Sequence, residues 1–145
     1  MEGNSLASLG ALHFLVVDDD PLMVCVAVEH FISLGIDVEA VSNGADALRK
    51  MEARLPDLVL CDRKMPEMSG AALLEEIRSR GPEWQRPAFI FVTGLVDRRD
   101  RYAMMPLHPD GYINKPVDFD KEDAVIAKIL REKRAANGAG SQGQS

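Results

Sequence analysis

Short apolar runs alternate with amphipathic segments along most of the chain. The runs have the length of strands, and two of them, residues 12–17 and 88–93, are almost without polar positions. Such continuous runs are typical of strands in a parallel sheet that helices cover on both faces. The segments between them place apolar residues at helical spacing. We expect strands at 12–17, 36–41, 57–61, 88–93 and 111–113, and helices at 21–34, 44–54, 70–80, 97–105 and 119–134.

This alternation predicts an α/β fold of five βα units, a doubly wound (βα)5 sandwich with helices on both faces of a five-stranded parallel sheet. Local signals support the first helix. Asp20 is a good N-cap residue, Pro21 suits the first helical position, and Gly35 follows the last turn. The fourth helix is expected to be short and mobile, because Pro106 and Pro109 interrupt the pattern.

Both ends of the chain lack the large apolar residues that a core requires. Residues 1–10 are small and polar, so we expect a flexible N-terminal arm. Residues 135–145 are rich in Gly, Ser, Gln and Ala, which predicts a disordered C-terminal tail. The remaining residues, 11–134, are expected to form one domain, in agreement with a total length of 145 residues.

The charge balance narrows the class of protein. The chain carries 17 basic and 23 acidic residues, a net charge of −6. An acidic chain argues against binding to nucleic acid or to an acidic membrane surface, since both require clustered Lys and Arg. No apolar run approaches the ~18–20 residues that span a bilayer. The N-terminus also lacks the basic region of a signal peptide. We therefore expect a cytoplasmic protein.

The cysteines and histidines suggest no site in the sequence. Cys25 and Cys61 lie in apolar stretches without metal-ligand spacing, so both are expected to be small core residues in a reducing compartment. His13, His30 and His108 belong to no motif and are interpreted as incidental.

Polar residues stand where the expected strands end. The first strand is followed by Asp18-Asp19-Asp20, the third by Asp62, the fourth ends in Thr93, and Lys115 follows the fifth. In a doubly wound sheet, ligands bind outside the carboxyl ends of the strands. We therefore expect these side chains to meet in one crevice.

Three carboxylates in one crevice require compensation. Two unit charges ~4 Å apart interact by about 4 kcal/mol at an effective dielectric of 20. One Lys offsets part of this repulsion, and a divalent cation would offset the rest. Because the candidate ligands are oxygens, Mg²⁺ is favoured, with Mn²⁺ or Ca²⁺ as options. A cation, a Lys and a Thr hydroxyl around an Asp can also hold a phosphoryl group, with the Asp as nucleophile.

The motifs at these strand ends resemble those of the receiver domain of bacterial two-component response regulators. The resemblance covers about residues 12–133, and its most specific element is Asp62 followed by Met65-Pro66 and Ser69-Gly70. It implies a flavodoxin-like fold with strand order 2-1-3-4-5. The matching segments are LVVDDDP (15–21), DLVLCDRKMPEMSG (57–70), FVTG (91–94) and GYINKP (111–116).

The resemblance implies a role for each acidic position. Asp62 would accept a phosphoryl group from the phosphohistidine of a histidine kinase or a histidine phosphotransfer protein. Asp18 and Asp19 would form the acidic pair that holds Mg²⁺ (Mn²⁺ being possible), with Asp19 as the more direct ligand. Asp62 and the backbone carbonyl of Lys64 would complete the metal ligands.

The resemblance also implies the residues that respond to phosphorylation. Thr93 would move inward and bond a phosphoryl oxygen, and Lys115 would pair with the acids and then with the phosphoryl group. The Lys115–Pro116 bond is often cis in this family. Tyr112 would be an aromatic switch, although a Tyr at this place can also simply pack on the sheet edge. Partners would dock on the surface of the fourth helix, fifth strand and fifth helix.

The implied function is that of a stand-alone, single-domain response regulator, expected to be a monomer. It would be a phospho-acceptor signalling protein rather than an enzyme, catalysing only its own phosphoryl transfer and autodephosphorylation and acting on a downstream protein. A receiver cut from a larger protein would look similar.

Two other functions fit the sequence less well. An aspartate-nucleophile phosphatase or phosphotransferase would use Asp18 and Asp20, but it would need a substrate-covering segment and would leave the Asp62 motif unexplained. A flavodoxin-like FMN binder would need a Ser/Thr-rich phosphate loop after the first strand, where this chain carries acids.

Overall fold

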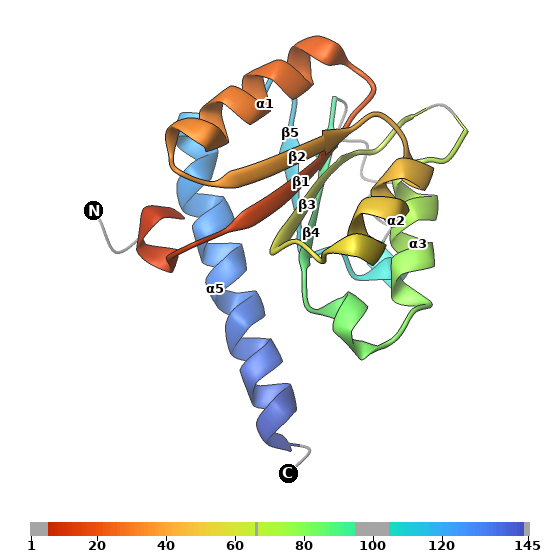
Figure 1. The fold of residues 1–145 in the computed structure, drawn as a ribbon, viewed down its shortest axis with the longest axis vertical. Coiled ribbons are helices and arrows are strands. Elements are labelled where there is room, and N and C mark those ends of the chain that lie inside the picture. Colours follow the sequence, from red (N-terminus) through yellow and green to blue (C-terminus); the bar gives the residue numbers. More distant parts are fainter. Residues whose placement is uncertain (1–5, 66, 95–104, 144–145) are drawn as a thin grey trace.

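The computed structural model describes residues 6–65, 67–94 and 105–143. Its centre is a five-stranded parallel sheet with the order β2-β1-β3-β4-β5, shown edge-on in Figure 1. The predicted fold class and strand order are therefore confirmed. The strands are β1 (His13–Val17), β2 (Asp37–Val41), β3 (Leu58–Asp62), β4 (Ala88–Thr93) and β5 (Gly111–Asn114).

Helices cover both faces of the sheet (Figure 1). The helices α1 (Pro21–Ser33) and α5 (Phe119–Gly143) lie on one face, and α2 (Gly44–Ala53) and α3 (Gly70–Arg78) lie on the other. Three short 3₁₀ helices, η2 (Leu6–Leu9), η3 (Pro82–Gln85) and η4 (Met105–Leu107), complete the described elements. None of the described helices is long and apolar enough to cross a membrane.

Each face of the sheet has its own apolar core, because successive strand residues point to opposite faces. On β1, Phe14 and Val16 pack with α1 and α5, whereas Leu15 and Val17 pack with α2 and α3. The ring of Phe14 meets that of Phe31 from α1 edge-on, with centroids 4.9 Å apart. The sheet is thus a rigid platform, and its strand ends hold fixed positions.

The structure corrects the expected domain boundaries at both ends. Helix α5 continues to Gly143, so residues 135–143 are helical rather than disordered. Arg134 Nη1 donates to Leu9 O at 2.9 Å, and Asn137 Nδ2 donates to Arg86 O at 3.0 Å. These contacts hold α5 to the rest of the chain as far as Asn137, and adding a turn to an existing helix costs less than starting one. Within the N-terminal arm, Leu6 is 2% exposed in the core between the sheet and α5.

Helix α1 turns a different side to the sheet from the one that the expected burial of Cys25 requires. Ala27 and Phe31 are its buried residues, and Cys25 lies on the exposed side with Leu22 and Val26. The prediction that Cys25 is a core residue was therefore wrong, whereas Cys61 on β3 is buried as expected. Most of the fourth helix, predicted at 97–105, lies outside the described residues.

Candidate functional site

The carboxyl ends of the parallel strands bring the predicted acids together. Asp18 follows β1 directly and is 3% exposed, and Asp62 is the last residue of β3. Asp18, Asp19 and Asp62 each offer a carboxylate oxygen, and these oxygens all lie within 4.8 Å of one another. The structure thus places three acids in a space that one cation could fill.

Lys115, just after β5, supplies a positive charge to this cluster. Its Nζ lies 3.6 Å from Asp18 Oδ2 and 3.5 Å from Asp62 Oδ1. The bond from Lys115 to Pro116 is cis. The Lys115 backbone is itself fixed, because its N–H donates to Thr93 O at 2.8 Å. Strands β4 and β5 therefore hold the ammonium group above two of the three carboxylates.

Asp18 is the acid most affected by its surroundings. Its pKa is raised above the ordinary value of 3.8, first because burial removes water from the carboxylate. The nearby charges of Asp62 and Asp19 raise the pKa further, whereas the N–H of Asp20 and the charge of Lys115 oppose the rise. That N–H donates to Asp18 Oδ1 at 2.9 Å. Burial is thus the main reason that the charged form of Asp18 is disfavoured, and the neighbouring acids add to it.

The donor set of the cluster fits a hard divalent cation. Its side-chain donors are the carboxylate oxygens of Asp18, Asp19 and Asp62, and Lys115 offsets only one of the three negative charges. Mg²⁺ binds one or two carboxylates and keeps several waters. Asp18 and Asp19 also line an adjoining hollow with Ser42 and Asp46, so solvent reaches the acids from that side.

A second cleft lies directly beside Asp62. Its volume is about 400 Å³, and its lining comprises Asp62, Arg63, Lys64, Thr93, Gly94 and Lys115. Thr93, at the end of β4, is 4% exposed. A cleft of this kind, with a carboxylate, a hydroxyl and an ammonium group on its walls, suits a small tetrahedral anion that becomes attached to the carboxylate.

The loop after β3 is shaped by a glycine. The Gly70 N–H donates to Arg63 O at 2.9 Å, and α3 begins at Gly70 with Ser69 as its N-cap. A Cβ at position 70 would lie only 2.5 Å from Asp62 O. Only glycine allows α3 to approach the backbone of Asp62 this closely, so Gly70 is a structural requirement of the site.

Tyr112 and Cys61 lie near the site, and both pack against the protein interior. The ring of Tyr112 stacks against Phe91, with centroids 6.0 Å apart and planes 25° from parallel. Cys61, next to Asp62, is buried, and burial followed by the charges of Asp62 and Asp18 raises its pKa well above the ordinary value. The thiol therefore stays protonated and does not compete with Asp62 as a nucleophile.

Arg63 lines the cleft but was not predicted as a site residue. No local sequence pattern shows which side chain of a loop faces a cleft. The place of Arg63 directly after Asp62 was the one available signal.

The family of the chain follows from comparison with known proteins. Residues 14–127 match the model of the response regulator receiver domain. The chain belongs to this family. Receiver domains are signalling modules of two-component systems, where they interact with histidine kinases and downstream effectors. The strand-end acids, Thr93 and Lys115 all lie within the matched residues.

Individual relatives agree with this membership. The transcriptional regulatory protein ZraR of Salmonella typhimurium is 33% identical over 128 residues, which cover 86% of this chain and 28% of ZraR. This receiver domain therefore spans less than a third of that relative.

Two solved structures agree in fold. A CheY-like receiver domain from Methanospirillum hungatei superposes with a TM-score of 0.79 and 28% identity, over 88% of this chain and 99% of that one. The receiver domain of the sensor histidine kinase PA1611 from Pseudomonas aeruginosa, with magnesium coordinated in its active-site cleft, gives a TM-score of 0.71 and 27% identity, over 85% and 97%.

Proposed function

We propose that Asp62 is the phospho-acceptor of this receiver domain and that the domain acts as a response regulator in a two-component system. The supporting observation is the position of Lys115, whose ammonium group lies 3.5 Å from Asp62 Oδ1 and 3.6 Å from Asp18 Oδ2. The same ammonium group would balance the acids before transfer and the phosphoryl group after it.

The reaction is a nucleophilic displacement at phosphorus. A carboxylate oxygen of Asp62 forms the new O–P bond, and the P–N bond to the donor phosphohistidine breaks. The nitrogen keeps the electron pair, and the imidazole leaves as a neutral base when the other ring nitrogen of the donor carries a proton. Hydrolysis of the acyl phosphate by water then returns the carboxylate and inorganic phosphate, which is the proposed autodephosphorylation.

Asp18, Asp19, Asp62 and the backbone carbonyl of Lys64 would hold Mg²⁺, as their oxygen donors and incompletely balanced charge suit this ion. When bound, the ion would neutralise charge on the phosphoryl oxygens. Mn²⁺ has the same ligand preference.

The signal would leave the site through Thr93 and Tyr112. Thr93 lines the cleft beside Asp62, so its hydroxyl can bond a new phosphoryl oxygen. Tyr112 lies on β5, next to β4, and its ring stacks on Phe91 two residues before Thr93. Movement of Thr93 would shift the population of two Tyr112 arrangements, and with it partner binding at the surface of the fourth helix, β5 and α5. We propose a cytoplasmic monomer with a protein as its downstream target.

Mass spectrometry after incubation with acetyl phosphate and Mg²⁺ tests the acceptor. Wild type should gain one phosphoryl group and Asp62→Asn none. Glu52→Gln, which replaces an exposed carboxylate in α2, should label like wild type. EDTA should abolish labelling, and beryllofluoride should shift the amide signals of Thr93 and Tyr112.

The same experiment separates the phosphatase alternative. Labelling that persists in Asp62→Asn but disappears in Asp18→Asn would assign the nucleophile to the end of β1 and overturn our proposal. The structure disfavours that outcome, since Asp18 is 3% exposed and accepts a hydrogen bond from the N–H of Asp20.

A further inference from the structure

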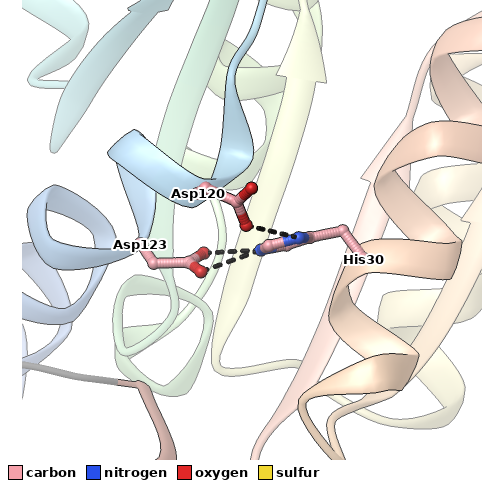
Figure 2. Close-up of side chains that lie close together, drawn as sticks. All are labelled: His30, Asp120 and Asp123. Atoms are coloured by element: carbon pink, nitrogen blue, oxygen red, sulfur yellow. Dashed lines mark hydrogen bonds and ion pairs between the residues drawn. The ribbon is translucent and has the colours of Figure 1, made fainter. Parts of the chain in front are cut away.

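A second group of possible metal ligands lies between α1 and α5, on residues outside the strand-end cluster. Figure 2 shows the imidazole of His30, from α1, between the carboxylates of Asp120 and Asp123 in the first turns of α5. One ligand atom from each residue can be chosen so that all three lie within 4.8 Å of one another. Asp120 and Asp123 are three positions apart, which places them on the same side of the helix.

The contacts of His30 show how the group is arranged. Its Nε2 lies 2.9 Å from both Asp123 Oδ1 and Asp123 Oδ2, and its Nδ1 lies 3.8 Å from Asp120 Oδ1. The imidazole stacks on the ring of Phe119, with centroids 5.4 Å apart, and meets the ring of Phe31 edge-on. These rings fix the plane of the imidazole, so its Nε2 keeps pointing at Asp123.

The charge of this group is unbalanced. Among the ion pairs that the described residues make, His30 is the only partner of either Asp120 or Asp123. Two carboxylates therefore share one imidazole, which carries at most a single positive charge.

The surroundings of His13 provide a contrast. Its two ring nitrogens lie 3.3 Å from Asp37 Oδ2 and 3.2 Å from Glu39 Oε1. Those carboxylates already have cationic partners, since Arg54 lies 2.8 Å from Asp37 and Lys50 lies 2.9 Å from Glu39. The carboxylates at His30 have no equivalent cation in the described part of the chain.

We propose that His30, Asp120 and Asp123 bind a divalent cation of the borderline class, such as Zn²⁺, which would link α1 to α5. One imidazole nitrogen and two carboxylates are ligands that suit Zn²⁺, whereas the all-oxygen cluster at Asp62 suits Mg²⁺. The two sites would therefore differ in ion class as well as in position.

Forming the site requires a small shift at Asp123 and a rotation of the Asp120 side chain. A tetrahedral Zn²⁺ ion with ligands at about 2.0–2.1 Å separates neighbouring ligand atoms by about 3.3 Å. The 2.9 Å gap between His30 Nε2 and Asp123 therefore has to widen by only a few tenths of an ångström. The Asp120 side chain is 92% exposed, so it can rotate to the Nε2 side without disturbing the core. Water would occupy the remaining position.

Calorimetric titration of the full chain with ZnCl₂ tests the proposal, with excess Mg²⁺ present to occupy the strand-end acids. We expect one equivalent to bind, and the ring-proton signals of His30 to shift while those of His13 and His108 stay in place. Zn²⁺ should also raise the midpoint of thermal unfolding, because an ion that binds only the folded state stabilises it.

Variants identify the ligands. Asp123→Asn keeps the size and a hydrogen-bond acceptor but removes the charge, so it should weaken Zn²⁺ binding at least tenfold, as should His30→Gln. His108→Asn removes a histidine outside the group, at a positive φ that Asn tolerates, and should bind Zn²⁺ like wild type.

Unchanged affinity in Asp123→Asn, or no His30 shift in the wild type at saturating Zn²⁺, would overturn the proposal even if His30→Gln failed to fold. Phosphorylation of Asp62 by acetyl phosphate should proceed in Asp123→Asn, so failure of this site and failure of the proposed function are distinguishable.

Discussion

Asp18 illustrates how a single residue can favour a binding site at the expense of stability. Its carboxylate is 3% exposed and shares a small space with Asp19 and Asp62. Burial raises the pKa of Asp18, and the Asp20 N–H and Lys115 offset this rise only in part. A group arranged in this way prefers to be neutral in the folded protein unless a cation is bound.

The substitution Asp18→Asn should stabilise the metal-free protein at pH 7. The unfolded chain loses the Asp18 proton near pH 3.8, while the folded chain keeps it to a higher pH. The free energy of unfolding therefore falls as the pH rises through this window, and Asn, which cannot ionise, avoids the fall. Urea unfolding in EDTA at pH 7 should give a higher midpoint for Asp18→Asn than for wild type.

The difference between the two proteins should shrink as the pH falls toward the ordinary value of 3.8, because the folded chain regains the Asp18 proton before the unfolded chain does. Glu29→Gln, at an exposed carboxylate of α1, serves as the control and should follow the wild type. A lower midpoint for Asp18→Asn at pH 7 would contradict this view of the cluster.

At the scale of elements, α3 is joined to the segment that leads into β5. Arg78, the last residue of α3, donates from Nε to Leu107 O at 2.9 Å and from Nη2 to His108 O at 2.7 Å. Its Nη1 donates to Gln85 Oε1 at 3.0 Å. Burial lowers the pKa of Arg78, against the opposing charge of Asp110, but the guanidinium stays charged. One side chain thus fixes the entry to the strand that carries Tyr112.

Replacing Arg78 by Met should destabilise the protein by roughly 2 kcal/mol, because two backbone carbonyls and the Gln85 amide lose a charged donor. The loss should appear as faster hydrogen exchange in β5 as well as a lower urea midpoint. Arg49→Met, at a side chain that is 71% exposed, is the matched control and should change stability little. Equal exchange rates in β5 for Arg78→Met and wild type would show that the loop is held by other contacts.

At the scale of the whole molecule, the two ends of the chain support each other. The first described residues form η2, which packs on α5, and Arg134 of α5 bonds the carbonyl of Leu9. Leu6 fills a place in the core between the sheet and α5. The N-terminal segment therefore closes one core of the sandwich.

Leu6→Ala should lower the free energy of unfolding by about 2 kcal/mol or more, since it leaves a cavity in a packed core. Leu22→Ala makes the same chemical change on α1 at a side chain that is 72% exposed, and it should cost less than about 0.5 kcal/mol. Urea unfolding of both variants checks the difference. Similar costs at the two positions would mean that the N-terminal segment does not contribute to the core.

The sequence by itself determined the fold and the composition of the candidate site. The alternation of apolar runs and helical patterns is local, and a parallel sheet necessarily brings its carboxyl ends to one edge. The positions of Asp18, Asp62, Thr93 and Lys115 at four strand ends therefore predicted that these side chains would come together. The motif around Asp62 indicated the family because it is one continuous segment, residues 57–70, and so can be recognised without the fold.

The tertiary structure decided what depends on contacts between distant segments. Cys25 is exposed because Ala27 and Phe31 face the sheet, and residues 21–28 are apolar on all sides, so their pattern does not indicate which side is buried. Leu6 is buried because η2 packs on α5, a contact between segments far apart in the sequence. The group at His30 exists only because α1 and α5 share one face of the sheet. Local patterns determine which elements form, and packing between them determines which side chains meet.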